Sequence, residues 1–333
     1  MSRIFLAGAA GVIGRRLTPL LVAYGHAVWG ATRSPDKSDL LRDLGARPVL
    51  VDAFDAGALT AAVVEAKPDI VIHQLTDLSA IADPARRSAA LAGNARIRDE
   101  GTRNLVAAAR KAGARRLIAQ SIAWAYAPGR RPYAEDHPLD ANAEGDRGVS
   151  VRGVESLERQ ALNASPMQGI VLRYGRLYGP GSADAPPAPP SVHVDAAAYA
   201  ALLAIDHGDP GVFNIADPSD EAATHKATAA LGWRADFRMD PAYRMPFNWI
   251  TSAFIARLEF LEPRPFPRET QDYWGWICLD FLGFSRPKLD LSMGYEDKSA
   301  KDYSSRLLPR IVDAATGACG SGRGSAGSLI RQA

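Results

Sequence analysis

RIFLAGAAGVIG, residues 3–14, joins a short apolar run to glycines with the spacing Gly-x-x-Gly-x-x-Gly. In such a segment the first glycine permits a tight turn after a strand. The second lets the backbone approach a phosphate, and the third permits close packing of helix on strand. The helix that follows offers free N–H groups and a partial positive charge. The segment therefore predicts a site for the pyrophosphate of a dinucleotide, formed by Gly8, Ala10, Gly11, Val12, Ile13 and Gly14.

Apolar runs of strand length alternate with helical patterns through the first half of the chain. Strands are expected at Ile4–Gly8, Ala27–Thr32, Pro48–Val51, Asp69–His73, Arg116–Gln120 and Gly169–Arg173. Helical patterns occupy Val12–Tyr24, Ala58–Glu65, a long stretch within Ala85–Ala112, and Val151–Leu162. Alternation at this spacing implies parallel strands joined by right-handed crossovers, with helices on both faces. The predicted fold class is α/β, a Rossmann-type doubly wound parallel sheet.

The pattern changes after Arg173, close to the point at which we divide the chain. Turns and a Pro-rich loop precede a helical pattern, a strand and a further helix, at Ala196–Ala204, Gly211–Ile215 and Ala222–Leu231. We expect an NAD(P)-binding domain at residues 1–170 and a smaller substrate lobe of the same fold at 171–240. Residues 241–316 are expected to form an aromatic-rich C-terminal extension. Residues 317–333, dominated by Gly, Ser and Ala, are expected to be a disordered tail.

The end of the second predicted strand bears on which dinucleotide is bound. A site for NAD usually has an acidic residue there, which holds the ribose 2′-hydroxyl. This strand ends with Thr32-Arg33-Ser34, and no carboxylate occurs before Asp36. Arg33 is a planar cation suited to a 2′-phosphate, so NADP(H) is predicted in preference to NAD(H). Asp52, after the third strand, either meets the adenine edge or caps the helix that follows.

Composition and charge argue against several classes of function. A net charge of +2 is too small to favour nucleic acid or an anionic membrane as a partner. No apolar run has the length of a membrane span, and no secretory signal pattern precedes the first strand. Cys278 and Cys319 lie far apart without metal-ligand spacing, which predicts reduced thiols and no metal site. We expect a cytoplasmic protein that binds a small-molecule substrate.

Further motifs follow the glycine loop in a characteristic order. They are the strand at Ile70–His73, Gly101-Thr102-Arg103-Asn104-Leu105, Leu172-Arg173-Tyr174, Tyr178-Gly179-Pro180-Gly181 and Val192-His193-Val194-Asp195. Together they resemble the extended short-chain dehydrogenase/reductases, in particular the NAD(P)-dependent epimerase/dehydratase group, over residues 3–238. The resemblance implies a nicotinamide cofactor covered by the loop after the fourth strand, which contains Leu75. It also implies that a homodimer can form through the helices near 103–112 and 151–162.

The resemblance fails at the residues that carry the family's chemistry. That family normally uses a Ser or Thr, a Tyr, and a Lys four residues after the Tyr. The Tyr transfers the hydroxyl proton and the Lys lowers its pKa. Ser121 resembles the family's serine, which orients the substrate oxygen. The aligned positions of the Tyr and Lys hold Ser150 and Val154, and no Tyr in the sequence has a Lys four residues later. Arg98 stands where the family often has an Asn.

Two functions remain open from the sequence. In the first, the chain is an NADP(H)-dependent oxidoreductase or epimerase/dehydratase-like enzyme for a small hydroxyl or carbonyl compound, with Ser121 and Tyr126 catalytic. Tyr126 is the predicted replacement acid because it closely follows the strand that leads to Ser121. Ser150 and His193 are weaker candidates, and His73 is expected to be structural. In the second, the chain is a catalytically silent NADP(H)-binding sensor or scaffold.

Overall fold

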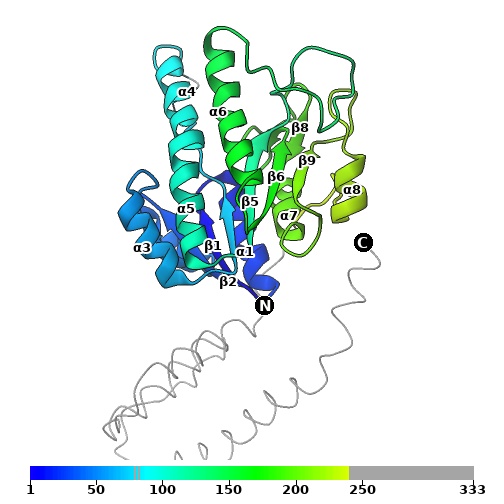
Figure 1. The fold of residues 1–333 in the computed structure, drawn as a ribbon. Helices are drawn as coiled ribbons and strands as arrows, with labels where there is room; N and C mark the ends of the chain where they lie inside the picture. Colours follow the sequence, from blue (N-terminus) through cyan, green and yellow to red (C-terminus); the bar gives the residue numbers. More distant parts are fainter. Residues whose placement is uncertain (79, 82, 240–333) are drawn as a thin grey trace, which may run out of the picture. The chain divides into compact units, whose positions relative to one another are not determined.

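The computed structural model describes residues 1–239 apart from 79 and 82, and it shows a parallel sheet between helices (Figure 1). Its seven strands have the order β3-β2-β1-β4-β5-β6-β9, and each neighbouring pair is parallel. The strands are β1 (Arg3–Ala7), β2 (Ala27–Thr32), β3 (Arg47–Leu50), β4 (Ile70–His73), β5 (Arg116–Ile122), β6 (Gln168–Tyr174) and β9 (Gly211–Ile215). The predicted α/β fold with a doubly wound parallel sheet is confirmed.

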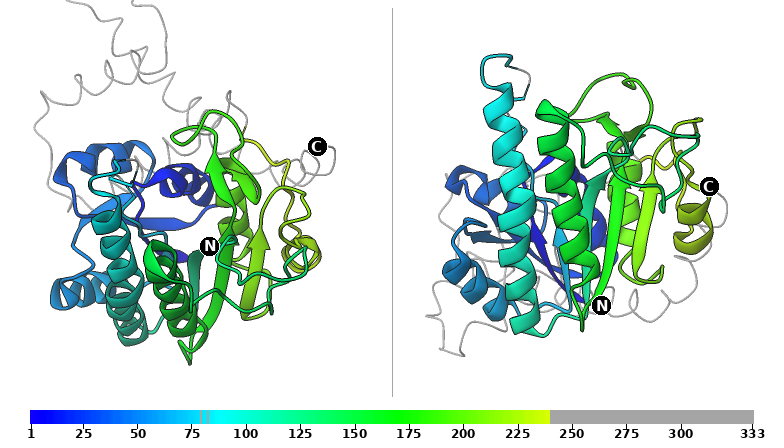
Figure 2. Two further views of the ribbon diagram at one scale, coloured as in Figure 1. Left: turned by 90° about the horizontal axis from the view of Figure 1, so that it is seen from above. Right: turned by 45° about the horizontal axis from the view of Figure 1, so that its top comes forward.

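The helices form two layers because successive strand side chains point to opposite faces of the sheet. Ile4 and Leu6 belong to one hydrophobic cluster, and Phe5 and Ala7 belong to the other. The first layer contains α1 (Val12–Ala23), α2 (Ser38–Asp43), α7 (Val194–Leu203) and α8 (His225–Leu231). The second contains α3 (Ala56–Ala66), α5 (Thr102–Ala112) and α6 (Gly145–Leu162), with α4 (Arg87–Arg96) packed against α6 (Figure 2).

The long helical pattern within 85–112 is interrupted by one π-helical turn. Helix α4 continues into this turn, η2 (Ile97–Gly101), and then into α5. Turns of this kind occur mostly as single bulges inside α-helices, and they are frequent at functional sites. The turn brings Arg98 to the second helical layer with its side chain nearly buried. Sequence periodicity gave no sign of this interruption.

Short or polar segments account for the other differences from the predicted elements. Helix α6 begins at Gly145 rather than Val151, because its first turn is polar and carries no apolar repeat. The short elements η1 (Pro35–Lys37), α2, β7 (Arg176–Tyr178) and β8 (Ser191–His193) were not predicted, since none is long enough to show a period.

Residues 171–240 contribute to the main sheet as well as to a small separate sheet. Strand β9 pairs with β6, and α7 packs against α1, whereas β7 and β8 form a separate two-stranded sheet. The domain boundary at 170 stays a prediction. The segments 241–316 and 317–333, and both cysteines, lie outside the described residues.

The helices predicted to join two subunits lie side by side on one face of the sheet (Figure 1). Their solvent-exposed residues include Arg103 on α5 and Arg152, Glu155 and Arg159 on α6. The face is therefore largely charged, and the homodimer stays a prediction. None of the described helices is long and apolar enough to cross a membrane. Over the same residues, no cluster of His, Cys, Asp or Glu could hold a metal ion.

His73 is a fully buried histidine at the end of β4. Its Nδ1 accepts a hydrogen bond from the Leu75 N–H at 3.3 Å, and its Nε2 lies 2.9 Å from Thr102 Oγ1. Since Nδ1 is an acceptor, Nε2 carries the proton and donates it to Thr102. Desolvation by burial lowers the pKa of His73 to about 4. The side chain fixes the loop after β4, which confirms its structural assignment.

Mild acid should destabilise the folded chain through His73. The unfolded chain protonates this residue near the ordinary pKa of 6.5, whereas the folded chain keeps it neutral down to about 4. The unfolded state then binds more protons, so the free energy of unfolding falls as the pH drops from 6.5 towards 4. Between about pH 7 and about pH 5 the loss from this group should be about 2 kcal/mol. Urea unfolding should show a correspondingly smaller loss in His73→Gln, and equal losses in the two proteins would contradict this prediction.

Candidate functional site

A cavity opens where the strand order of the sheet reverses. Strand β1 lies between β2 and β4, and ligands of such sheets bind outside the carboxyl ends of the strands at this point. The cavity has a volume of about 1160 Å³ and is lined by the segments that follow β1, β2, β3, β4, β5 and β6. The loops after β1 and β4 touch each other, since a Cβ added to Gly8 would lie 2.3 Å from the Gln74 carbonyl oxygen.

The glycine loop forms one wall of this cavity. Gly8 has a φ of +85°, and a Cβ on Gly14 would lie 2.4 Å from the Gly8 carbonyl oxygen. The turn and packing roles predicted for these two residues are therefore confirmed. Gly11 has ordinary backbone angles, and its added Cβ would meet only the Gly8 carbonyl oxygen, at 3.2 Å. Gly11 is the N-cap of α1 and provides no side-chain cap, so the first N–H groups of the helix remain free for a ligand.

The other residues predicted to bind the cofactor also lie at the cavity. Ala10, Val12 and Ile13 line it beside the glycine loop, and Leu75 lines it after β4. Arg33 and Asp52, after β2 and β3, lie on its rim. The binding roles of these residues remain part of the proposal below.

Arg33 and Asp52 each have partners that refine the sequence interpretation. Arg33 Nη2 lies 2.7 Å from Asp77 Oδ2, and the Arg33 side chain is 56% exposed. Asp52 Oδ1 accepts a hydrogen bond from the Phe54 N–H at 2.9 Å. Helix α3 is instead capped by Asp55, whose side chain accepts from the Ala58 N–H. The capping alternative for Asp52 is therefore wrong.

The cavity also holds a buried polar atom that fits a bound cofactor. Gln74 Oε1 is the buried side-chain atom that lacks a hydrogen-bond partner within the described part of the chain. The amide Nε2 of the same residue donates to the Tyr174 hydroxyl at 3.4 Å, and both residues line the cavity. A buried acceptor without a partner is unfavourable, so its position suits a ligand that donates a hydrogen bond. With the glycine loop and the free helix N-terminus, the residues present fit a dinucleotide.

Ser121 belongs to a buried ionic network at the end of β5. Its Oγ donates a hydrogen bond to Glu158 Oε1 at 2.6 Å. Arg173 holds the same carboxylate through two bonds, from Nε at 2.9 Å and from Nη2 at 2.6 Å. All three side chains are buried, and Ser121 lines the cavity. Since a carboxylate only accepts, the Ser121 proton points to Glu158, and Ser121 offers lone pairs to a ligand.

The structure corrects the role predicted for Tyr126. Its hydroxyl donates to Asn214 Oδ1 at 2.6 Å and accepts from Arg173 Nη1 at 2.9 Å. Tyr126 is only 3% exposed, is not among the residues that line the cavity, and has a pKa raised by burial. The reason is local: Tyr126 forms an antiparallel bridge with Leu139, which turns it away, and Trp124 lines the cavity instead. A replacement acid at Tyr126 is therefore not supported.

Of the two weaker catalytic candidates, His193 has a structural role and Ser150 lies at the cavity. His193 caps α7, because its Nδ1 accepts from the Asp195 N–H at 3.1 Å, which is a structural role. Ser150 lines the cavity, where its hydroxyl accepts a hydrogen bond from Arg98 Nη1 at 3.2 Å. Val154, which the sequence predicts to stand at the position of the family's lysine, is fully buried in a small apolar cluster.

Three charged residues at the site were not assigned a role from the sequence. They are Arg98, Glu158 and Arg173, each at most 6% exposed. The sequence contains a signal for two of these three residues. Arg173 interrupts an apolar strand, and Glu158 lies four residues after Val154 on the buried face of α6. A charge on a buried face usually has a partner or a function, so both positions could have been identified.

The family model described as "NAD dependent epimerase/dehydratase family" matches residues 4–191, more than half of the chain. The chain therefore belongs to the NAD dependent epimerase/dehydratase family, as its motifs indicated. Membership confirms that the cofactor is a nicotinamide dinucleotide, without deciding between NAD and NADP.

Two relatives and one solved structure show how similar the chain is to individual known proteins. The chain is 41% identical over 249 residues to the 3-diazoavenalumate denitrifying reductase of a Streptomyces species, covering 66% of this chain and 77% of that protein. It is 33% identical over 180 residues to the dTDP-4-dehydrorhamnose reductase of Streptomyces griseus, covering 54% and 51%. The solved UDP-glucose 4-epimerase of Thermotoga maritima aligns with a TM-score of 0.56 at 19% identity, covering 75% and 99%, which shows the shared fold.

Proposed function

We propose that this chain is an NADP(H)-dependent reductase whose acceptor takes up a hydride at carbon without receiving a proton from the enzyme. The observation that carries the proposal is a cavity that keeps the cofactor framework, in a sequence in which no Tyr is followed four residues later by a Lys. The sequence motifs predict that Ser150 and Val154 stand at the positions of the family's Tyr and Lys. Ser121, the residue retained from that relay, directs its proton to Glu158.

The Tyr174 hydroxyl in the cavity is a poor proton donor. Tyr174 lines the cavity, but burial raises the pKa of the Tyr174 hydroxyl. Reduction of a ketone places negative charge on oxygen, and an acid of suitable pKa normally neutralises it. Since the described cavity offers no Tyr–Lys pair for this step, ketone reduction is disfavoured.

An aryl diazonium compound is an acceptor that needs no such acid. When bound, the reduced nicotinamide supplies a hydride. An aryl diazonium that accepts a hydride at its carbon gains a C–H bond and loses N₂, which departs with the electron pair of the C–N bond. No proton enters the product. The name of the 41% identical relative, a denitrifying reductase for a diazo compound, supports this choice of acceptor.

A turnover panel tests the proposal. The full chain is incubated with NADPH and either an aryl diazo carboxylate, the matched aryl ketone or the matched aldehyde. We expect NADPH oxidation and the nitrogen-free arene from the diazo compound, well above the rate without protein. Ketone or aldehyde reduction with an inert diazo compound would contradict the proposal. Tight NADPH binding without turnover on any acceptor would instead favour the silent sensor or scaffold.

The preference for NADP(H) over NAD(H) rests on the rim after β2. Arg33, Ser34 and Lys37 all line the cavity there, so two cations and a hydroxyl surround the expected position of the ribose 2′-phosphate. Asp77 pairs with Arg33 and offsets part of that charge. The guanidinium can exchange this carboxylate for a phosphate, because two oxygens of a phosphate can also accept two parallel N–H bonds from the planar guanidinium.

Arg33→Ala should weaken NADPH binding and leave NADH binding almost unchanged. The expected loss is about 1–2 kcal/mol, or roughly 5- to 30-fold in Kd, because the charge-assisted bonds form at a half-exposed position. Calorimetric titration of both cofactors measures it. Arg42→Ala is the matched control, since Arg42 is similarly exposed, is also paired with an aspartate, and lies outside the cavity lining. A wild-type chain that prefers NADH would contradict the assignment.

A further inference from the structure

Arg98 is a buried cation in the wall of the cavity. The residue is 6% exposed, and within the described part of the chain no acidic side chain forms an ion pair with it. Glu158 is the acidic group whose charge acts on Arg98. That carboxylate is already bound by Arg173 and Ser121. Buried charges are normally paired, so the isolated guanidinium needs an explanation.

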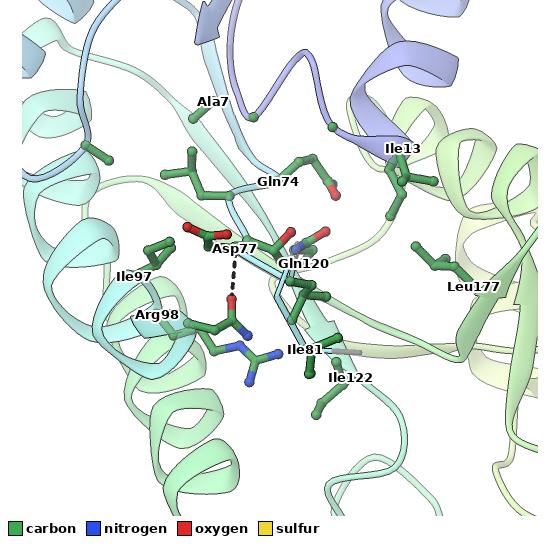
Figure 3. A pocket seen from close by; sticks show the side chains of 18 of the residues that line it. Ala7, Ile13, Gln74, Asp77, Ile81, Ile97, Arg98, Gln120, Ile122 and Leu177 are labelled. Atoms are coloured by element: carbon green, nitrogen blue, oxygen red, sulfur yellow. Dashed lines mark hydrogen bonds between the residues drawn. The ribbon is translucent and has the colours of Figure 1, made fainter. Parts of the chain in front are cut away.

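The hydrogen bonds of Arg98 leave most of its donors unused. Nη1 donates to the Ser150 hydroxyl at 3.2 Å and to the Ser150 carbonyl oxygen at 3.3 Å. A guanidinium has five N–H donors and no acceptor, so several remain for a ligand. Figure 3 shows the guanidinium projecting from its helix into the cavity, which it lines. Burial lowers the pKa of Arg98 to about 10, so it is charged at neutral pH but poorly solvated.

The surroundings favour an anion at this point. The cavity wall around Arg98 includes the apolar side chains of Ile97 and Ile122. Charge interactions are stronger next to such surfaces than in water. Ser150, the residue that Arg98 contacts, is predicted from the sequence to stand at the position of the family's proton-transferring Tyr. The cation therefore lies beside the part of the cavity where the reacting end of a substrate is expected.

We propose that Arg98, together with the Ser150 hydroxyl, binds a negatively charged oxygen of the substrate. This inference rests on the proposed function and deepens it, because it assigns the acceptor to the class of anionic compounds. A carboxylate and an aryl oxyanion present the same chemistry to a guanidinium, and the experiment below separates them. Arg98 positions the substrate in this role and transfers no proton.

Binding to the full chain saturated with NADP⁺ tests the assignment. The probes are cinnamate, which carries a carboxylate, cinnamamide, its neutral counterpart, and 4-nitrophenolate, an aryl oxyanion. Titrations compare the wild type with Arg98→Met, Arg98→Lys and the control Arg87→Met. Arg87 also lines the cavity, but its side chain is 59% exposed and lies near Asp146. The anion that binds identifies the substrate group that Arg98 recognises.

The wild type should bind at least one anion more than about tenfold more tightly than cinnamamide. Arg98→Met should weaken the binding of that anion by about 30-fold or more. Arg98→Lys should keep part of the wild-type affinity for the anion, and Arg87→Met should keep nearly all of it. NADP⁺ affinity should not change. Arg98→Met should melt at or above the wild-type temperature, because it removes a buried charge and leaves no carboxylate unpaired.

Several results would overturn the assignment. They are anion binding that survives Arg98→Met, equal binding of cinnamate and cinnamamide, no binding of either anion, and loss of NADP⁺ affinity in Arg98→Met. If Arg98→Met does not fold, the assignment is overturned, because the guanidinium is then a structural tether of α6. A failure of the proposed reductase function can be told apart from a failure of the Arg98 assignment. Arg98-dependent anion binding without turnover contradicts the proposed function alone. Turnover that does not depend on Arg98 contradicts this inference alone.

Discussion

Gly11→Val should abolish NADPH binding while leaving the chain folded. The backbone angles at Gly11 suit any residue, and its added Cβ would meet only one atom within 4 Å, the Gly8 carbonyl oxygen at 3.2 Å. The branched side chain would, however, fill the space next to the N-terminus of α1, where the pyrophosphate is expected. We expect a loss of affinity of at least about 100-fold, or about 3 kcal/mol.

Calorimetric titration of NADPH measures this loss, and circular dichroism checks the fold. Gly93→Val is the matched control, because Gly93 is an exposed helical glycine with no atom within 4 Å of its added Cβ. The control should bind NADPH like the wild type. Wild-type affinity in Gly11→Val would remove the glycine loop from the site.

The second large effect is expected at the buried ion pair below Ser121. Glu158→Gln leaves the Arg173 guanidinium in the core without its carboxylate, and both side chains are at most 6% exposed. Breaking a buried pair by neutralising one partner costs about 3–5 kcal/mol, because the other charge remains uncompensated. Urea unfolding at neutral pH should show a loss of this size.

Two comparisons separate this effect from a general sensitivity to mutation. Replacing both charges, as in Glu158→Leu with Arg173→Met, should destabilise the chain less than the two single changes together. Glu100→Gln removes a partly exposed carboxylate that pairs with the exposed Arg96, and its effect should be much smaller. Equal losses in Glu158→Gln and Glu100→Gln would contradict the importance of the buried network.

The sheet and the glycine loop could be predicted because their signals are local. Each buried parallel strand is a short apolar run, and the glycines lie directly between the first strand and its helix. Strand positions therefore agreed to within one or two residues, as at Ile4–Gly8 against Arg3–Ala7. The first residues of helices with polar first turns, such as α6, could be predicted less closely from the sequence.

The chemistry of the site depends on contacts between distant residues, which periodicity does not reveal. Ser121 and Glu158 are 37 positions apart in the chain, and Tyr126 and Arg173 are 47 apart. Proximity in sequence to Ser121 suggested that Tyr126 faced the cofactor. Its pairing with Leu139 and its bonds to Asn214 and Arg173 hold the Tyr126 side chain away from the cavity instead. The π-helical turn that positions Arg98 has no signature in the sequence.

The origin of the new hydrogen in the product tests the central claim most directly. The full chain converts an aryl diazo carboxylate with NADPH that carries deuterium at the transferable C4 position, and the reaction is repeated with unlabelled NADPH in D₂O. Gly11→Val, which should not bind the cofactor, gives the uncatalysed background. We expect deuterium from the cofactor at the carbon that lost N₂ and none from D₂O. Hydrogen derived from solvent at that carbon would contradict hydride transfer to a proton-independent acceptor.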